Sequence, residues 1–185
     1  MTLSINKTFV WDGIIVNIAL PQDYDGSRPY PAVLLNDGQI NYLSKLSPSV
    51  ILIGLISNNR LDDYTPWKAN ALKPDNPDFG GKADSYHQKL FTGILTEIRR
   101  HYLLDEKRIA YGGYSLGGLA AVYSLYSDCK IPCIFFYLRL LLVPRFYRLL
   151  PDTGLEKQGL SSLFAEWKDR RCESLEPTFQ GSFLC

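Results

Sequence analysis

The stretch RIAYGGYSLGGLAAVYSLY, residues 108–126, decides the fold class of this chain. It starts as an apolar strand, ends as an Ala- and Leu-rich helix, and carries Gly113-Tyr114-Ser115-Leu116-Gly117 between the two. A G-x-S-x-G pattern between a strand and a helix is typical of a nucleophile elbow, a sharp turn that exposes the serine hydroxyl at the end of a sheet. Glycines two residues before and after the serine avoid collisions with the neighbouring strand and helix. We therefore expect Ser115 to be a nucleophile; the alternative is a tight turn without chemistry.

The segments around this stretch alternate between strand and helix patterns. Asp12-Gly13 predicts a hairpin turn within residues 8–21. Short apolar runs predict buried strands at 32–36, 50–57, 108–111 and 131–136, and helical periodicity covers 82–102 and 116–126. A long polar loop is expected between residues 58 and 81. The alternation predicts an α/β protein with a mostly parallel sheet flanked by helices.

Composition narrows the class of protein. The chain has 185 residues, 13% aromatics and a net charge of +1, with 20 basic residues against 19 acidic ones, which fits a soluble globular domain and gives no basic surface for nucleic acid. Arginines interrupt the apolar stretch around residues 135–150, so no membrane span is expected. No secretory signal is visible at the N-terminus, which makes the cytoplasm the expected compartment. The four cysteines lack zinc-ligand spacing, so we expect free thiols and no metal or other cofactor.

Four stretches, taken with their order and spacing, resemble the α/β-hydrolase serine esterases of the putative-esterase family, which includes siderophore (enterochelin) esterases and S-formylglutathione hydrolases. They are residues 19–25 with 30–35, the segment 36–39 (NDGQ), the segment 60–67 (RLDDYTPW), and the elbow at Ser115. The resemblance covers about residues 7–134 and implies an α/β-hydrolase fold. It also implies hydrolysis of a small-molecule carboxylic ester.

The resemblance assigns roles to residues of the elbow and of the loop after strand 32–36. Ser115 would be the nucleophile, and the backbone N–H of Leu116 would be one oxyanion donor. A second donor would come from Gly38 or Gln39. Asn36 and Asp37, which precede these two residues, belong either to this oxyanion loop or to a plain turn, and the sequence leaves both interpretations open.

The resemblance also points to substrate contacts in the segment 60–67. Arg60, Asp63, Tyr64 and Trp67 would approach the active edge of the sheet, where Arg60 could meet an anionic or catecholate-bearing acyl group. The alternative is structural, with Tyr64 and its neighbours folding over Trp67 as a small satellite core.

Both histidines of the chain precede the serine in the sequence. In α/β-hydrolases the order along the chain is serine, then acid, then histidine, yet His87 and His101 both precede Ser115. At 1.5 Å per residue, His101 falls about 30 Å along the helix from its start, near the opposite end of the sheet. His87 is near enough for a base, although a surface or helix-packing role is the commoner one. No ordinary triad can be assembled.

The last third of the chain departs from the pattern of the rest. No isoleucine occurs after Ile134, and no strand is expected after Tyr137. We interpret residues 1–137 as the α/β-hydrolase core, incomplete at its C-terminal side, and residues 138–185 as an atypical tail, unrelated in sequence or disordered. A shift of reading frame would produce such a tail; a diverged but functional C-terminus is the rival explanation.

Two functions follow from these observations. The first is serine-dependent hydrolysis of carboxylic esters through Ser115. The second is a catalytically inactive, truncated or frame-shifted hydrolase-like protein that lacks the triad Asp and His. The oligomeric state cannot be predicted from the sequence.

Overall fold

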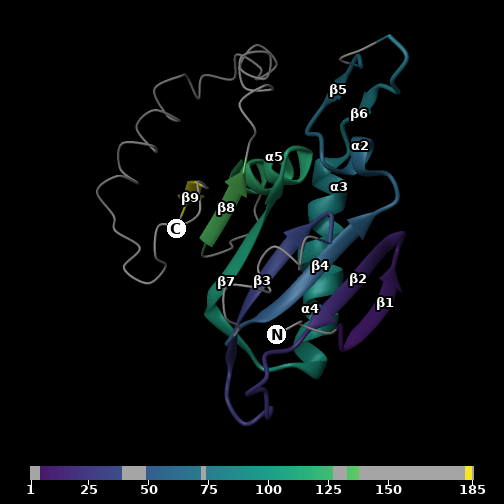
Figure 1. The fold of residues 1–185 in the computed structure, drawn as a ribbon. Coiled ribbons are helices and arrows are strands. Elements are labelled where there is room, and N and C mark those ends of the chain that lie inside the picture. Colours follow the sequence, from purple (N-terminus) through teal and green to yellow (C-terminus); the bar gives the residue numbers. More distant parts are fainter. Residues whose placement is uncertain (1–4, 39–48, 72–73, 127–132, 138–181, 185) are drawn as a thin grey trace.

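A seven-stranded mixed sheet forms the centre of the protein (Figure 1). The computed structural model describes residues 5–38, 49–71, 74–126, 133–137 and 182–184, the last two ranges for their backbone only. The strand order is β1-β2-β4-β3-β7-β8-β9. The strands are β1 (Lys7–Trp11), β2 (Ile14–Ala19), β3 (Tyr30–Asn36), β4 (Ile51–Ser57), β7 (Leu104–Tyr114), β8 (Cys133–Tyr137) and β9 (Ser182–Leu184).

Parallel pairing is confined to the middle of the sheet. β3 pairs in parallel with β4 and β7, and β7 with β8, whereas β1, β2 and β9 are antiparallel to their neighbours. Asp12 and Gly13, with φ of 44° and 81°, form the tight β1–β2 turn, as their sequence predicts. The α/β-hydrolase fold expected from the sequence is therefore confirmed for the described part of the chain.

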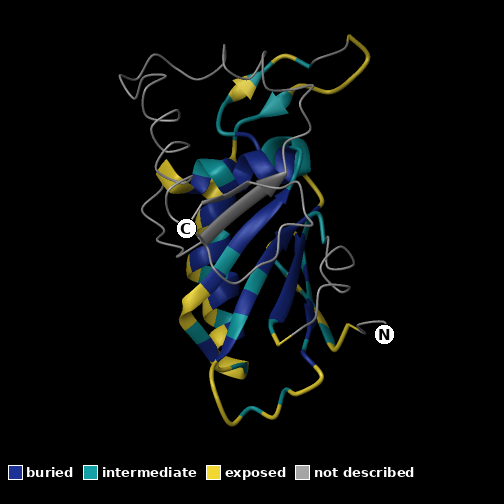
Figure 2. Cartoon of the chain, turned by 60° about the vertical axis from the view of Figure 1, so that its left-hand side comes forward, coloured by how far each residue is buried: buried dark blue, intermediate teal, exposed yellow. Residues whose placement is uncertain are grey.

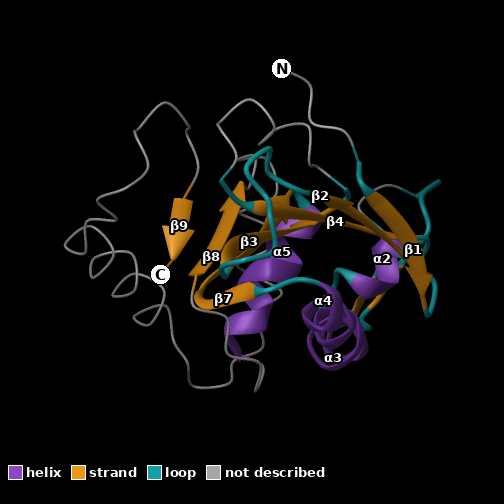
Figure 3. Cartoon of the chain, turned by 90° about the horizontal axis from the view of Figure 1, so that it is seen from below, coloured by secondary structure: helices purple, strands orange, loops and turns teal. Residues whose placement is uncertain are grey.

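The helices within residues 83–101 and the helix that follows β7 pack against one face of this sheet (Figure 3). The helix expected at 82–102 consists of α3 (Ala83–Gln88), a π-helical segment (Lys89–Ile94) and α4 (Leu95–His101) in direct succession. Helix α5 (Leu116–Tyr123) begins immediately after the elbow and ends in a 3₁₀ turn (Ser124–Tyr126).

The core lies between the central strands and these helices (Figure 2). Strand β4 lies between β2 and β3 and is buried at six of its seven positions, on both faces of the sheet. A continuous apolar run such as ILIGLIS is the sequence pattern of a strand of this kind. The helices contribute residues at helical spacing, among them Tyr86, Leu90, Ile94 and Ile98, each at most 1% exposed.

The segment expected to be a polar loop, residues 58–81, has local structure. It contains α2 (Arg60–Asp63) and a small hairpin of β5 (Lys68–Ala69) and β6 (Phe79–Gly80), which projects beyond the end of the sheet (Figure 1). These elements have two to four residues, too few to produce a periodic pattern, so sequence periodicity could not reveal them.

The C-terminal prediction was wrong at one point. Strand β9 follows Tyr137 and pairs antiparallel with β8, although no strand was expected there. Three residues make this strand, and its position depends on pairing with β8 rather than on a local pattern. Residues 138–181 lie outside the described residues, so the interpretation of residues 138–185 as an atypical tail stays a prediction. None of the described helices is long and apolar enough to cross a membrane.

Candidate active site

Ser115 lies at the junction of β7 and α5, in a strained backbone conformation. Its φ of 55° and ψ of −122° are unusual for a residue with a side chain. Such a turn sends the chain from strand into helix without a connecting loop, as the elbow pattern predicts. The serine is partly exposed, and it immediately precedes the first helical turn of α5, whose N–H groups have no intrahelical acceptors.

Gly113 and Gly117 are required by close contacts across this turn. A Cβ on Gly113 would lie 2.7 Å from the Gly117 carbonyl carbon, and a Cβ on Gly117 would lie 2.8 Å from the Asn36 Cβ. Real Cβ atoms essentially never make contacts this short. The prediction that these glycines provide clearance is confirmed, and the partner that demands the clearance at Gly117 is Asn36.

The side chain of Asn36 lies at the centre of a buried polar network beneath the elbow. Its Nδ2 donates to the Tyr111 hydroxyl and to the Gly117 carbonyl, both at 2.8 Å, and its Oδ1 accepts from the Tyr86 hydroxyl at 2.6 Å. Asn36 is completely buried. Sequence reasoning left this residue open between the oxyanion loop and a plain turn. The sequence signal for a structural role of Asn36 is its position: it is the one polar residue of the run AVLLN, at the end of an otherwise apolar strand.

The loop after β3 turns sharply at Asp37 and Gly38, with φ of 59° and 63°. The Gly38 N–H donates to the Leu55 carbonyl at 3.0 Å. Because that donor is already hydrogen-bonded, this geometry does not support Gly38 as an oxyanion donor, and the role stays a prediction. Gln39, the other candidate, lies outside the described residues and stays a prediction.

Arg60 forms a two-pronged ion pair with Asp37. Nε and one terminal nitrogen lie 2.9 Å from Asp37 Oδ1 and Oδ2, and the guanidinium also lies over the Tyr64 ring at 5.7 Å. The hydrogen bond to Asp37 raises the pKa of Arg60, while burial opposes the shift. Arg60 thus braces the turn after β3 from α2. Because its side chain remains 38% exposed, a contact with substrate stays a prediction.

The other candidate residues of the segment 60–67 differ in their exposure: some are buried in the core or hydrogen-bonded to it, and one is partly exposed. Tyr64 is completely buried, packs edge-on against Tyr86 at 5.2 Å, and has its pKa raised to about 12, chiefly by burial. This burial does not support a substrate contact by Tyr64, which stays a prediction. Tyr64 belongs to the main core, whereas the structural alternative placed it in a satellite core over Trp67. Asp63 accepts a hydrogen bond from Ser57 at the end of β4, which anchors α2. Trp67 is partly exposed at the start of the β5–β6 hairpin and stays a predicted substrate contact.

His87 lies in the aromatic core on the inner side of α5. Its ring stacks on Tyr123 at 6.0 Å and contacts Phe91 and Tyr111 at 5.6 and 5.9 Å. It is 1% exposed, and neither ring nitrogen has a hydrogen-bonding partner of normal geometry in the described residues. Burial lowers its pKa to about 4, against weaker opposing effects of Asp84 and the Ala120 backbone. His87 is a packing residue in this geometry.

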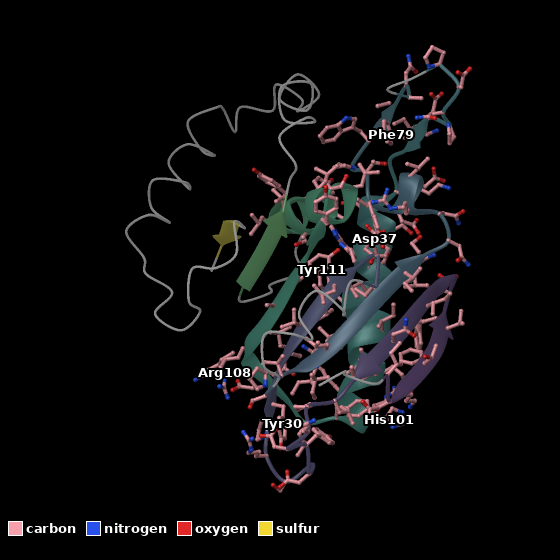
Figure 4. The ribbon with its side chains drawn as sticks, viewed as in Figure 1. Tyr30, Asp37, Phe79, His101, Arg108 and Tyr111 are labelled. Atoms are coloured by element: carbon pink, nitrogen blue, oxygen red, sulfur yellow. The ribbon has the colours of Figure 1, made fainter. Side chains whose placement is uncertain are left out.

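His101 lies far from the elbow. It is exposed near the C-terminal end of α4, where Nε2 lies 3.1 Å from Glu97, and Figure 4 shows it at the end of the sheet opposite to Asp37. Within the described residues, no hydrogen bond joins the Ser115 hydroxyl to a histidine, and no group of three or more His, Cys, Asp and Glu could hold a metal ion.

Residues 12–131 match the protein family described as Putative esterase. In sequence, the chain is 31% identical over 130 residues to the uncharacterized protein YbbA of Bacillus subtilis, covering 63% of this chain and 51% of YbbA. The chain thus belongs to this esterase family, and it spans about half the length of that relative.

Solved structures show the same fold. An IroE-like serine hydrolase from Shewanella oneidensis is 28% identical with a TM-score of 0.57, over 64% of this chain and 43% of that protein. The enterobactin hydrolase IroE, in complex with DFP, is 25% identical with a TM-score of 0.53, over 68% and 58% of the two chains. The BES protein from Bacillus cereus, at 18% identity and a TM-score of 0.58 over 69% and 60%, is similar in fold alone.

Proposed function

We propose that this protein is a serine-dependent carboxylic-ester hydrolase with Ser115 as its nucleophile. The observation that carries the proposal is the strained backbone of Ser115 between β7 and α5, held by Gly113 and Gly117 at contact distance. Strain at a partly exposed nucleophilic residue is typical of a functional site. Membership of the esterase family supports the same function.

The reaction proceeds in two steps. The Ser115 Oγ attacks the ester carbonyl and loses its proton to a base, and the alcohol leaves with a proton from that base. A water molecule then hydrolyses the acyl-enzyme by the reverse proton transfers. The Leu116 N–H, at the positive end of the α5 dipole, stabilises the oxyanion in both steps. No histidine follows Ser115 in the sequence, and in the part of the chain that the structure describes neither His87 nor His101 is hydrogen-bonded to its hydroxyl.

The substrate class is a small-molecule carboxylic ester. Two of the structural relatives are an IroE-like serine hydrolase and an enterobactin hydrolase, which favours a siderophore ester. Trp67 and Arg60, both partly exposed near the end of the sheet that carries Ser115, offer an aromatic surface and a guanidinium group, which is paired with Asp37, for such a ligand.

A second function, binding without catalysis, is favoured by the positions of the histidines. His87 is buried behind α5 and His101 lies at the other end of the sheet, so neither is placed to accept the Ser115 proton. The protein would then keep the elbow and bind ester-like ligands. A hydroxyl without a base is a weak nucleophile near neutral pH.

Reaction with a fluorophosphonate probe and hydrolysis of p-nitrophenyl acetate separate the two functions. For an esterase we expect labelling and turnover that disappear in Ser115→Ala and persist in Ser85→Ala, a matched change on the exposed face of α3. Loss of Ser115 in a working enzyme lowers kcat by about 10⁴-fold or more. Folded protein that shows neither labelling nor turnover would exclude the esterase and leave the binding function.

A further inference from the structure

The amide group of Asn36 is hydrogen-bonded through both its nitrogen and its oxygen. Both of its N–H groups donate, to Tyr111 and to Gly117, and its oxygen accepts from Tyr86, all within 2.8 Å. A buried amide with all these bonds made is stable, whereas a group that leaves its partners unpaired is costly. The side chain therefore has one preferred position.

The partners of Asn36 lie on both sides of Ser115. Tyr111 is on β7 before the elbow, Gly117 is in the first turn of α5 after it, and Tyr86 is on α3, which packs behind both. The Asn36 backbone is the last residue of β3, from which the turn at Asp37 leaves. One side chain thus joins the end of β3 to the strand and to the helix that hold Ser115.

The chemistry of the network requires an amide. Burial keeps the pKa of Tyr86 and of Tyr111 well above the ordinary value, so both hydroxyls stay protonated and neutral. A carboxylate at position 36 could not donate to the Gly117 carbonyl and would place a charge in the core. Leucine has a similar size but makes none of the hydrogen bonds.

We propose that Asn36 is a positioning residue of the esterase site, which fixes the elbow at Ser115 relative to the end of β3 through its hydrogen bonds to Gly117, Tyr111 and Tyr86. It does not touch substrate, because it is completely buried. The catalytic part of this inference rests on the proposed esterase function, and the structural part does not.

The test compares Asn36→Leu with Asn17→Leu, the same change on β2, where the amide oxygen accepts an exposed hydrogen bond from Thr8. Hydrogen exchange followed by mass spectrometry reports on the elbow without any need for activity. We expect peptides within 111–119 to exchange about tenfold faster in Asn36→Leu, the factor that corresponds to about 1.4 kcal/mol. Peptides within 7–19 should be unchanged, and Asn17→Leu should leave the elbow as in the wild type.

Activity provides a second readout. If the wild type hydrolyses p-nitrophenyl acetate, we expect Asn36→Leu to lower kcat about tenfold with KM changed less than twofold, because a displaced oxyanion donor acts on the transition state. Tyr86→Phe removes one of the hydrogen bonds to Asn36 and keeps the ring. It should lower kcat and speed exchange at the elbow by less than Asn36→Leu does, and it provides the test if Asn36→Leu fails to fold.

The outcomes distinguish the two proposals. An inactive wild type contradicts the esterase function, while faster exchange confined to the elbow still supports positioning by Asn36. Exchange at the elbow that is unchanged in both network variants, or that rises equally over the whole chain, would overturn the positioning role.

Discussion

At the scale of single residues, Ser115 shows how the fold holds an unfavourable conformation. A non-glycine residue at a φ of 55° costs about 1–3 kcal/mol, which the surroundings must offset. The offset comes from β7, which is paired on both sides, and from the buried first turn of α5. The strain places the hydroxyl at the end of the sheet instead of inside it.

His87 is the residue whose burial has the clearest consequence for stability. In the unfolded chain its pKa is the ordinary 6.5, whereas in the folded protein burial lowers the pKa to about 4. Between these values the unfolded state binds a proton that the folded state does not. The contribution of His87 to stability is therefore complete above about pH 6.5 and is lost as the pH falls toward 4.

We expect this loss to be measurable by urea unfolding at pH 6.5 and pH 5. The free energy of unfolding should fall by about 2 kcal/mol more in the wild type than in His87→Phe, which keeps an aromatic ring against Tyr123 and removes the titrating group. His101→Gln, a change at the exposed histidine, serves as the control variant. An equal pH dependence in wild type and His87→Phe would contradict the expectation.

At the scale of elements, the strands and helices that the sequence could reveal are those with a long periodic pattern. The four strands β1 to β4 and the helix at 116–126 agree with the prediction because apolar spacing determines which face is buried. α2 and the β5–β6 hairpin are too short for a pattern. Within the candidate site, the sequence could predict the elbow at Ser115 because it has a local motif. The Asn36 network joins residues that are distant in the sequence, so no local motif could reveal it.

The π-helical segment between α3 and α4 contains a glycine in close contact with β1. Gly93 lies within it against the Trp11 indole, and a Cβ on Gly93 would lie 2.6 Å from the Trp11 Nε1. The glycine thus brings the helix close to the β1 strand, and Trp11 packs against the core there. Such segments are rare in helices and mark local constraints.

A double-mutant cycle tests this contact. Gly93→Ala should destabilise the protein by about 1–3 kcal/mol, because the indole must move. In a Trp11→Leu background the same change should instead stabilise by up to about 1 kcal/mol, the helix preference of alanine over glycine. Urea unfolding of the four proteins gives the coupling energy. A Gly93→Ala effect of the same sign in both backgrounds would show that the indole contact is not the constraint.

At the scale of the whole molecule, the sheet has a well-packed middle and two antiparallel edges. Strands β4 and β3 lie inside with neighbours on both sides, whereas β1 is an edge strand whose Val10 is 66% exposed. Strand β9, at the other edge, has three residues. Stability in such a sheet decreases from the centre outward, because edge strands have fewer buried contacts.

Hydrogen exchange of the intact chain should reveal this order. We expect the amides of β4 and β3 to exchange slowest, those of β1 faster, and those of β9 fastest. Mass spectrometry of peptic fragments after a series of labelling times measures the exchange rate of each strand. Protection of β1 equal to that of β4 would mean that something covers the β1 edge in solution.

The order in which the ribosome releases the chain bears on when the Asn36 network can form. Its hydrogen bonds join residues 50, 75 and 81 positions apart. At a synthesis rate of about 5–20 residues per second, about 4–16 seconds pass between the addition of Asn36 and that of Gly117. During that time the amide is hydrated and β3 lacks its β7 partner. The elbow thus closes late in synthesis, and a nascent chain that stalls before β7, which begins at Leu104, presents an unpaired β3 edge to chaperones.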